Sequence, residues 1–192
     1  MSLVSLQKTK ASRVMGIDCS TKSLAFCIFY NRKPVKWGKV LFEGATVFDR
    51  LKDASQKVAA LLHQFDVDFI AMEGAILANN KNVRVTIDLS LVYGAVLAQL
   101  LLGRAKVIHV SPLEWQRAIG NPPFTRAETA QMKLDYPGKS PSWYTGQKRK
   151  MRKQRTMDFI NDKWPGMKIT DDDVGDACAI AYYAYNQLTR RK

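Results

Sequence analysis

Hydrophobic residues along the chain are spaced in two distinct ways. Short apolar runs bounded by turn residues indicate buried β-strands, and apolar residues that recur every three or four positions indicate amphipathic helices. Both spacings occur in this sequence, and they follow one another in a definite order. The strands are predicted at residues 14–19, 23–30, 35–42, 68–73 and 106–110, and the helices at residues 47–65, 83–102, 111–120, 147–164 and 171–188.

The order of these elements predicts the fold class. The first three strands are joined by short links, including a turn at residues 31–34, which is typical of an antiparallel meander. The last two strands alternate with helices, which is typical of parallel crossovers. We therefore predict an α/β fold with a mixed five-stranded sheet, three antiparallel strands and then parallel ones, and helices on both faces. A chain of 192 residues is long enough to form it as a single domain, residues 1–192.

Two segments depart from this regular pattern. Residues 1–12 are basic and lack acidic residues, and we predict a flexible arm there. Residues 121–146 are rich in proline and lose the helical spacing, which predicts a long, mobile loop. Before that loop, Ser111, Pro112 and Glu114 have the spacing of a capping box with proline at the first helical position, and they predict a helix start.

The net charge is the strongest compositional signal. A formal charge of +13 and a pI near 9.8 favour a polyanionic partner, nucleic acid rather than a membrane surface. Six cations without an acid lie within residues 147–155, and they would repel one another unless an anion lies across them. A solvated helix face is the plainer interpretation. We predict phosphate contacts by Lys148, Arg149, Lys150, Arg152 and Lys153.

Composition also bears on location. No apolar run reaches the roughly 18 residues that a membrane span needs. The longest run, residues 89–102, is predicted to be a buried helix. The whole helix, residues 83–102, has more hydrophobic surface than one sheet face needs, which makes it a candidate dimer element. Cys19, Cys27 and Cys178 show no metal-binding spacing, which favours reduced thiols and a cytoplasmic setting, the host cytoplasm if the protein is viral. A mitochondrial presequence in the basic start is the alternative.

Four acidic residues lie at the ends of predicted elements. Asp18 is near the end of the first strand, Glu73 ends the fourth, and Asp173 and Asp176 share a face at the start of the last helix. Ligand sites in α/β sheets gather at the carboxyl ends of strands, so adjacent strands would bring Asp18 and Glu73 together. Clustered carboxylates repel one another, and a hard cation relieves the repulsion. The set predicts two Mg²⁺ ions that serve phosphodiester hydrolysis, although residues 171–173 are also typical of a helix cap.

Three stretches that contain these acids resemble a known family. The RuvC-type Holliday junction resolvases, nucleases of the ribonuclease-H-like superfamily, are similar in order and spacing to three stretches of this chain: GIDCSTKS, FIAMEG and DDDVGDACAIAYY. The resemblance implies a ribonuclease-H-like fold and a homodimer that nicks two opposed strands of a four-way DNA junction, using Mg²⁺ or Mn²⁺. Departures from the family pattern, described next, indicate a divergent viral or organellar branch of the family. The family's catalytic, metal-binding tetrad maps onto Asp18, Glu73, Asp173 and Asp176.

Several positions differ from the family pattern. Cys19 and Ser20 stand where Pro-Gly often follows the first aspartate, and Ile76 stands where several members place an aromatic wedge. An apolar Ile76 can still part a base step. Gln116 and Arg117 are nearest to a lysine that is often found after the fifth strand. Besides the basic residues within 147–155, the predicted DNA contacts are Ser20, Thr21, Lys22, Ile76, Asn79, Asn80, Lys81, Arg84 and Arg117.

Three other functions stay open at this point. The stretch GIDCSTKS is also typical of the phosphate loop of an actin-like sugar kinase, although that fold needs two such domains. A ribonuclease-H-like nuclease acting on a flap, other branched DNA, an RNA–DNA hybrid or an RNA precursor would carry the same four acids. A non-catalytic nucleic-acid-binding module is the third, and unligated carboxylates would weaken its binding to DNA.

Overall fold

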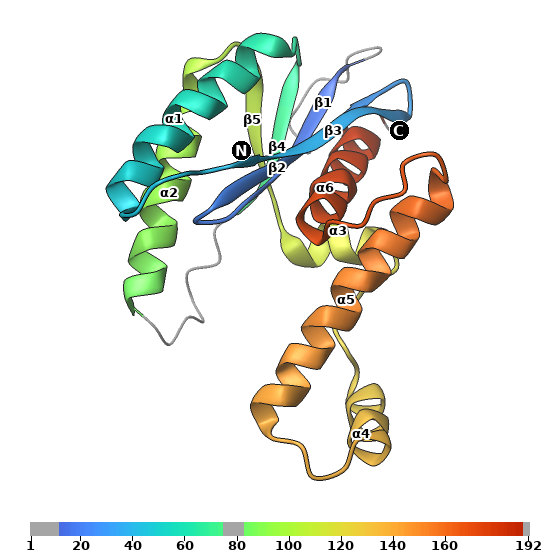
Figure 1. Cartoon of the computed structure of the whole chain (residues 1–192). Coiled ribbons are helices and arrows are strands. Elements are labelled where there is room, and N and C mark those ends of the chain that lie inside the picture. The colour runs from blue at the N-terminus through green and yellow to red at the C-terminus, as the bar shows by residue number, and fades with distance from the viewer. Residues whose placement is uncertain (1–11, 75–82, 190–192) are drawn as a thin grey trace.

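The strand order confirms the predicted fold class. The structure, a computed structural model, describes residues 12–74 and 83–189, so the predicted arm at residues 1–12 lies outside it apart from Ser12. The sheet has the order β3-β2-β1-β4-β5 (Figure 1). β1 is antiparallel to β2 and parallel to β4. The strands are β1 Val14–Cys19, β2 Ser23–Tyr30, β3 Lys33–Leu41, β4 Phe69–Glu73 and β5 Lys106–Val110.

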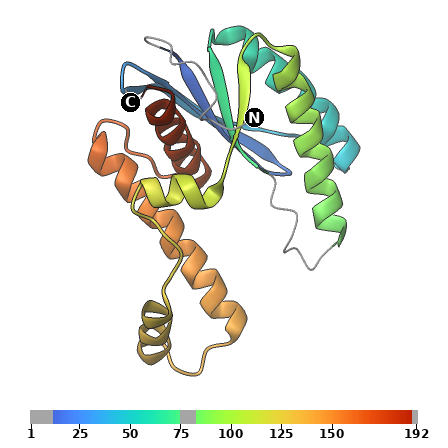
Figure 2. The same cartoon turned by 180° about the vertical axis from the view of Figure 1, so that it is seen from behind.

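Helices cover both faces of the sheet, as predicted. α1 and α2 lie on one face, and α6 lies on the other with α3 and the end of α5 beside it (Figures 1 and 2). Because side chains alternate along a strand, Met15 and Ile17 of β1 are buried under α1 and α2, while Val14 and Gly16 face α6. The helices are α1 Val47–Gln64, α2 Val83–Leu102, α3 Pro112–Ala118, α4 Arg126–Asp135, α5 Pro141–Lys163 and α6 Asp172–Thr189.

Gly16 lets α6 pack directly on β1. A Cβ atom at this position would lie 2.3 Å from the carbonyl oxygen of Ala177 and 2.4 Å from the backbone nitrogen of Ala181. No side chain fits into that space, so the glycine and the two small alanines set how closely the helix approaches the strand. Since Asp18 follows Gly16 by two residues, the same approach places Asp18 beside the first turns of α6.

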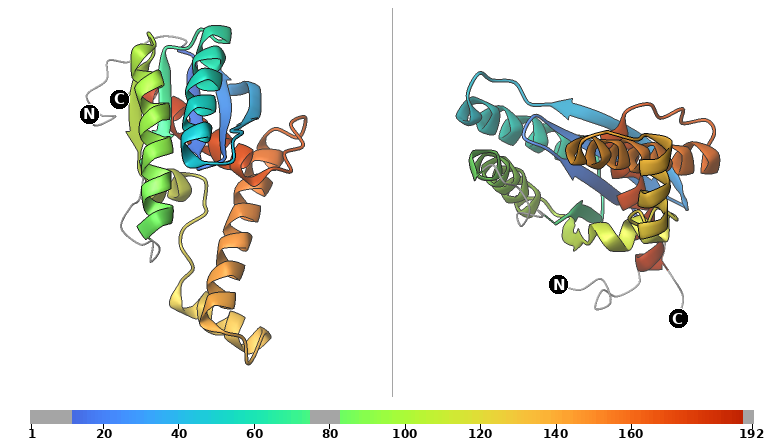
Figure 3. Two further views of the ribbon diagram at one scale, coloured as in Figure 1. Left: turned by 60° about the vertical axis from the view of Figure 1, so that its left-hand side comes forward. Right: turned by 90° about the horizontal axis from the view of Figure 1, so that it is seen from below.

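Regular structure fills most of the segment predicted to be a loop, residues 121–146. Thr125 and Glu128 form a reciprocal capping box that begins α4, and Ser140 caps α5 just before Pro141. Both helix starts are recognisable in the sequence, but the neighbouring prolines are also typical of turns, and they favoured the prediction of a loop. α4 and the first half of α5 project together away from the sheet (Figure 3). The mobility of this segment stays a prediction.

The predicted cap at the start of α3 is wrong in its details. Ser111 occupies the N-cap position, but its side chain makes no capping hydrogen bond. The carboxylate of Glu114 instead accepts a hydrogen bond from the hydroxyl of Tyr183 on α6 at 3.3 Å. The tertiary contact replaces the local one, so Glu114 links α3 to α6.

α2 is less buried than its composition predicted. Only Val92, Val96 and Leu100 are buried within it, whereas Ile87 is 52% exposed and Leu102 is 80% exposed. By length and composition alone the helix is apolar enough to cross a membrane, contrary to the expectation from its sequence. It packs beside α1 on the sheet (Figure 3) and leaves an apolar strip on its outer side.

Candidate active site

The four predicted acids line one pocket at the carboxyl ends of β1 and β4. Ile17 of β1 is paired with Met72 of β4, so the residues that follow them, Asp18 and Glu73, lie side by side at the end of the sheet. Asp173 and Asp176 reach the same place from the first turns of α6. The pocket has a volume of about 750 Å³. The structure therefore brings together the four residues that the sequence singled out.

Three of these carboxyl groups sit where ionisation is difficult. Burial, together with the nearby Asp176, Asp173 and Glu73 carboxylates, raises the pKa of Asp18 to about 8. Burial raises the pKa of Asp176 to about 7 and also raises the pKa of Glu73. A divalent cation binds carboxylate oxygens and offsets their mutual repulsion. The donor set and its crowding fit a hard cation such as Mg²⁺.

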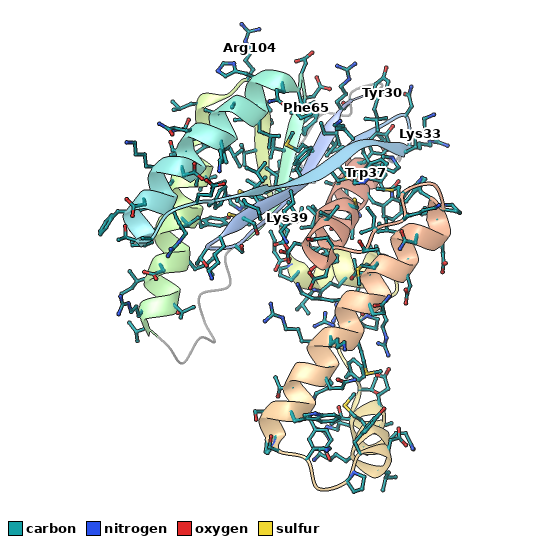
Figure 4. The ribbon with its side chains drawn as sticks, in the orientation of Figure 1. Tyr30, Lys33, Trp37, Lys39, Phe65 and Arg104 are labelled. Atoms are coloured by element: carbon teal, nitrogen blue, oxygen red, sulfur yellow. The ribbon has the colours of Figure 1, made fainter. Side chains whose placement is uncertain are left out.

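Asp173 differs from the other three because two lysines hold it. Lys39 Nζ lies 2.7 Å from Oδ2 of Asp173, and Lys153 Nζ lies 3.1 Å from Oδ1. Burial acts to raise the pKa of Asp173, but the hydrogen bonds from the two lysines outweigh it and lower that pKa. Lys39 comes from β3, beside α6 (Figure 4), and no pattern in the sequence connects it with the acids.

Glu73 is held in place by two residues that sequence reasoning also missed. Trp115 of α3, only 1% exposed, donates its indole N–H to Oε2 of Glu73 at 3.0 Å. The hydroxyl of Tyr93 on α2 donates to the Glu73 carbonyl at 3.4 Å and lies 3.1 Å from Nδ1 of His109. These contacts fix the backbone and the carboxylate of Glu73 from two sides.

Part of the predicted DNA-binding set lines the same pocket. Thr21 stands at one side, and α5 forms a basic wall at the other. Ser20 also borders the pocket, but its hydroxyl accepts from the backbone N–H groups of Lys22 and Ser23, so it closes the turn between β1 and β2. The predicted residues of α5 in the wall are Lys148, Arg149, Arg152 and Lys153.

The other predicted contacts fall elsewhere or outside the described residues. Lys22, Arg84 and Arg117 are exposed, and none of them lines the pocket. Lys150 lines a smaller pocket of about 400 Å³, which it shares with Arg149 and Lys153. The predicted contacts that lie outside the described residues are Ile76, Asn79, Asn80 and Lys81.

Acids from other elements pair with two of the six basic residues in the run on α5. Arg155 pairs with Glu128 of α4 at 3.1 Å, and its guanidinium lies over the ring of Phe124. Arg152 donates to the side chain of Gln116, and Lys153 pairs with the acids at the start of α6. The expectation of a run without acidic partners is therefore wrong for Lys153 and Arg155. Within residues 12–74 and 83–189 no ion pair involves Lys148, Arg149 or Lys150.

Comparisons with solved structures agree with this fold. Thermus thermophilus RuvC in complex with a Holliday junction substrate has a TM-score of 0.60 to this chain at 16% identity, covering 90% of this chain and 91% of that one. The yeast mitochondrial Holliday junction resolvase Ydc2 has a TM-score of 0.54, also at 16% identity, covering 97% and 86%. No family model and no curated protein matches the sequence. At these identities the comparison shows a shared fold: the chain has the fold of the RuvC and Ydc2 structures.

Proposed function

We propose that this protein is a structure-selective endonuclease that resolves four-way DNA junctions by paired, metal-dependent nicks. The observation that carries the proposal is a pocket with two kinds of wall. Partly buried carboxylates of β1, β4 and α6 form its floor, and the cations of α5 form one side. Carboxylates hold metal ions and cations hold phosphates, so a phosphodiester in this pocket would meet both.

The residues that would hold the metal are Asp18, Glu73, Asp176 and Asp173. Bound Mg²⁺, or Mn²⁺ in its place, would supply a water-derived nucleophile and stabilise charge on the leaving oxygen, and two ions are proposed. The protein's own groups do the positioning. Trp115 keeps the Glu73 carboxylate aimed at the pocket, and Lys148, Arg149 and Arg152 orient the backbone of the bound strand.

Paired nicks need two active sites, and α2 provides a surface for a second copy of the chain. Ile87 and Leu91 are more than one-third exposed on its outer side, as are Val83 and Leu101 at its ends. Exposed apolar strips of this kind mark interaction surfaces. We therefore propose a homodimer through α2. Sedimentation at micromolar concentration should show a dimer, and Leu91→Glu should convert it to a monomer that nicks a junction once rather than in pairs.

A substrate panel tests the proposed function. In Mg²⁺ the protein should cleave a four-way junction in preference to a flap, an RNA–DNA hybrid or plain duplex. Glu73→Gln should abolish each cleavage, because it removes a metal-ligand charge without changing the side chain's size. Preference for the hybrid or the flap would contradict the proposed substrate but would still support a nuclease activity. No cleavage of any substrate would contradict the proposal.

A further inference from the structure

Both carboxylate oxygens of Asp173 are occupied by lysines. Oδ2 accepts from Lys39 of β3 at 2.7 Å, and Oδ1 accepts from Lys153 of α5 at 3.1 Å. The three side chains are between 22% and 24% exposed, so these ion pairs are partly shielded from water. Each oxygen of Asp173 therefore already accepts from an ammonium group, and a metal ion at either oxygen would be repelled by the adjacent lysine.

Each lysine also pairs with a second carboxylate, and that carboxylate is not one of the proposed metal ligands. Lys39 lies 3.0 Å from Oδ2 of Asp171, and Lys153 pairs with Asp172. Asp171 is itself fixed, because its Oδ1 accepts the backbone N–H groups of Asp173 and Val174 at the start of α6. If Asp173 turns away, neither lysine is left as an unpaired charge, so the release costs little.

This arrangement explains the cluster of three consecutive acids. The oxygens of residues 171–173 lie within 4.8 Å of one another, a spacing that would also suit a metal ion. Their observed partners are lysine ammonium groups and backbone N–H groups. In this structure the three acids bind the ammonium groups of two lysines beside the proposed catalytic pocket.

Lys153 is also within reach of a bound phosphate. It lines the large pocket together with Asp18 and Arg149, and it lines the smaller pocket on α5 as well. A phosphate that enters beside Arg149 would compete with Asp173 for the ammonium group, because phosphate oxygens accept strongly from cations.

We propose that Lys39 and Lys153 act as a latch on Asp173, and that DNA phosphate at Lys153 opens the latch so that Asp173 can bind metal. The two lysines are positioning residues, and the inference rests on the proposed function. Binding of metal and binding of DNA are then mutually reinforcing, since coupling between two sites is reciprocal. The latch keeps the metal site incomplete until a substrate strand is in place.

The test measures Mn²⁺ binding by the full-length protein, from the electron paramagnetic resonance signal of free Mn²⁺. Without DNA, the double variant Lys39→Met/Lys153→Met should bind Mn²⁺ about tenfold more tightly than the wild type. Each of the two substitutions frees one oxygen of Asp173 from a charge-assisted hydrogen bond. Lys33→Met/Lys36→Met is the matched control, since it removes the same charge from exposed positions of β3, and it should bind Mn²⁺ as the wild type does.

The effect of DNA separates the latch from a simple loss of nearby charge. A junction built with phosphorothioate linkages, which keep the charge and resist cleavage, should tighten Mn²⁺ binding about tenfold in the wild type and in the control, but less than threefold in the double variant. Lys153→Gln alone carries the same test if thermal unfolding shows that the double variant is not folded. If DNA tightened Mn²⁺ binding equally in all variants, the latch would be overturned, but the proposed nuclease activity would not be affected. Absence of both Mn²⁺ binding and cleavage in the wild type would contradict the proposed function itself.

Discussion

The indole N–H of Trp115 donates a 3.0 Å hydrogen bond to the carboxylate of Glu73 across two separate elements of the fold. The ring is fully enclosed between α3, the sheet and α6, so it cannot reorient. A partner that orients a metal ligand in this way commonly changes metal affinity or activity when it is removed. Trp115 therefore belongs to the support of the active site.

Trp115→Phe should lower the rate of junction cleavage about 10- to 100-fold, because it keeps most of the ring and removes only the hydrogen-bond donor. Junction affinity should stay unchanged, and the Mn²⁺ concentration that gives half-maximal rate should rise. Trp164→Phe is the control, since Trp164 packs on Phe29 and Tyr182 away from the pocket. Equal losses in both variants would show that Trp115 acts only through packing.

Lys148, Arg149 and Lys150 are expected to contact DNA phosphates. Replacing all three by Ala should reduce the slope of log affinity against log salt by about 2.7, since each neutralised phosphate contributes about 0.9. Affinities for a junction and for a duplex, measured between low and moderate salt, give the two slopes. Lys33→Ala/Lys36→Ala/Lys52→Ala removes the same charge from exposed positions of β3 and α1. An unchanged slope in the α5 variant would contradict the contacts.

The raised pKa of Asp18 makes the metal-free protein less stable at alkaline pH. Its pKa is about 8 in the folded chain against an ordinary value of 3.8. Between these two values the folded state binds the proton that the unfolded state has lost, so the free energy of unfolding falls as pH rises. Urea denaturation in EDTA should show lower stability at pH 8 than at pH 5, and Mg²⁺ should restore it at pH 8.

Asp18→Asn provides the comparison for this pH effect. The amide cannot ionise, so the variant should be more stable than the wild type at pH 8 in EDTA and should gain less from Mg²⁺. If the wild type and the variant lost the same stability between pH 5 and pH 8, the buried carboxyl group would not be the cause.

Sequence patterns predicted the sheet and the meeting of the four acids in one pocket, because both follow from the order of the elements along the chain. Asp18 and Glu73 close apolar strands, and the topology rule that places such ends together needs no atomic detail. The roles of Lys39 and Trp115 were not predicted, because they depend on contacts between elements that are distant in the sequence. Lys39 looks like any lysine of an edge strand, and only the close approach of α6 over Gly16 brings the start of α6 beside it.

The α4 and α2 helices show two other limits. Thr125 and Glu128 are a recognisable helix start, but nearby prolines suggested turns, and short polar helices give a weak periodic signal. The apolar composition of α2 predicted burial, yet composition does not say whether the second side of a helix meets the same chain or another one. The packing shows which residues form its exposed strip, among them Ile87 and Leu102.

Asp18 is the residue on which the proposed activity depends most, since its carboxyl group interacts electrostatically with each of the other three acids. Asp18→Asn keeps the size of the side chain and removes a charge that would hold metal. The most direct measurement is the single-turnover rate of four-way junction cleavage in Mg²⁺, together with junction affinity in EDTA. The variant should cleave about 1,000-fold more slowly or not at all, which corresponds to roughly 4 kcal/mol of lost transition-state stabilisation, and should bind the junction at least as tightly as the wild type. Cleavage by Asp18→Asn at the wild-type rate would contradict a metal-dependent nuclease site in this pocket.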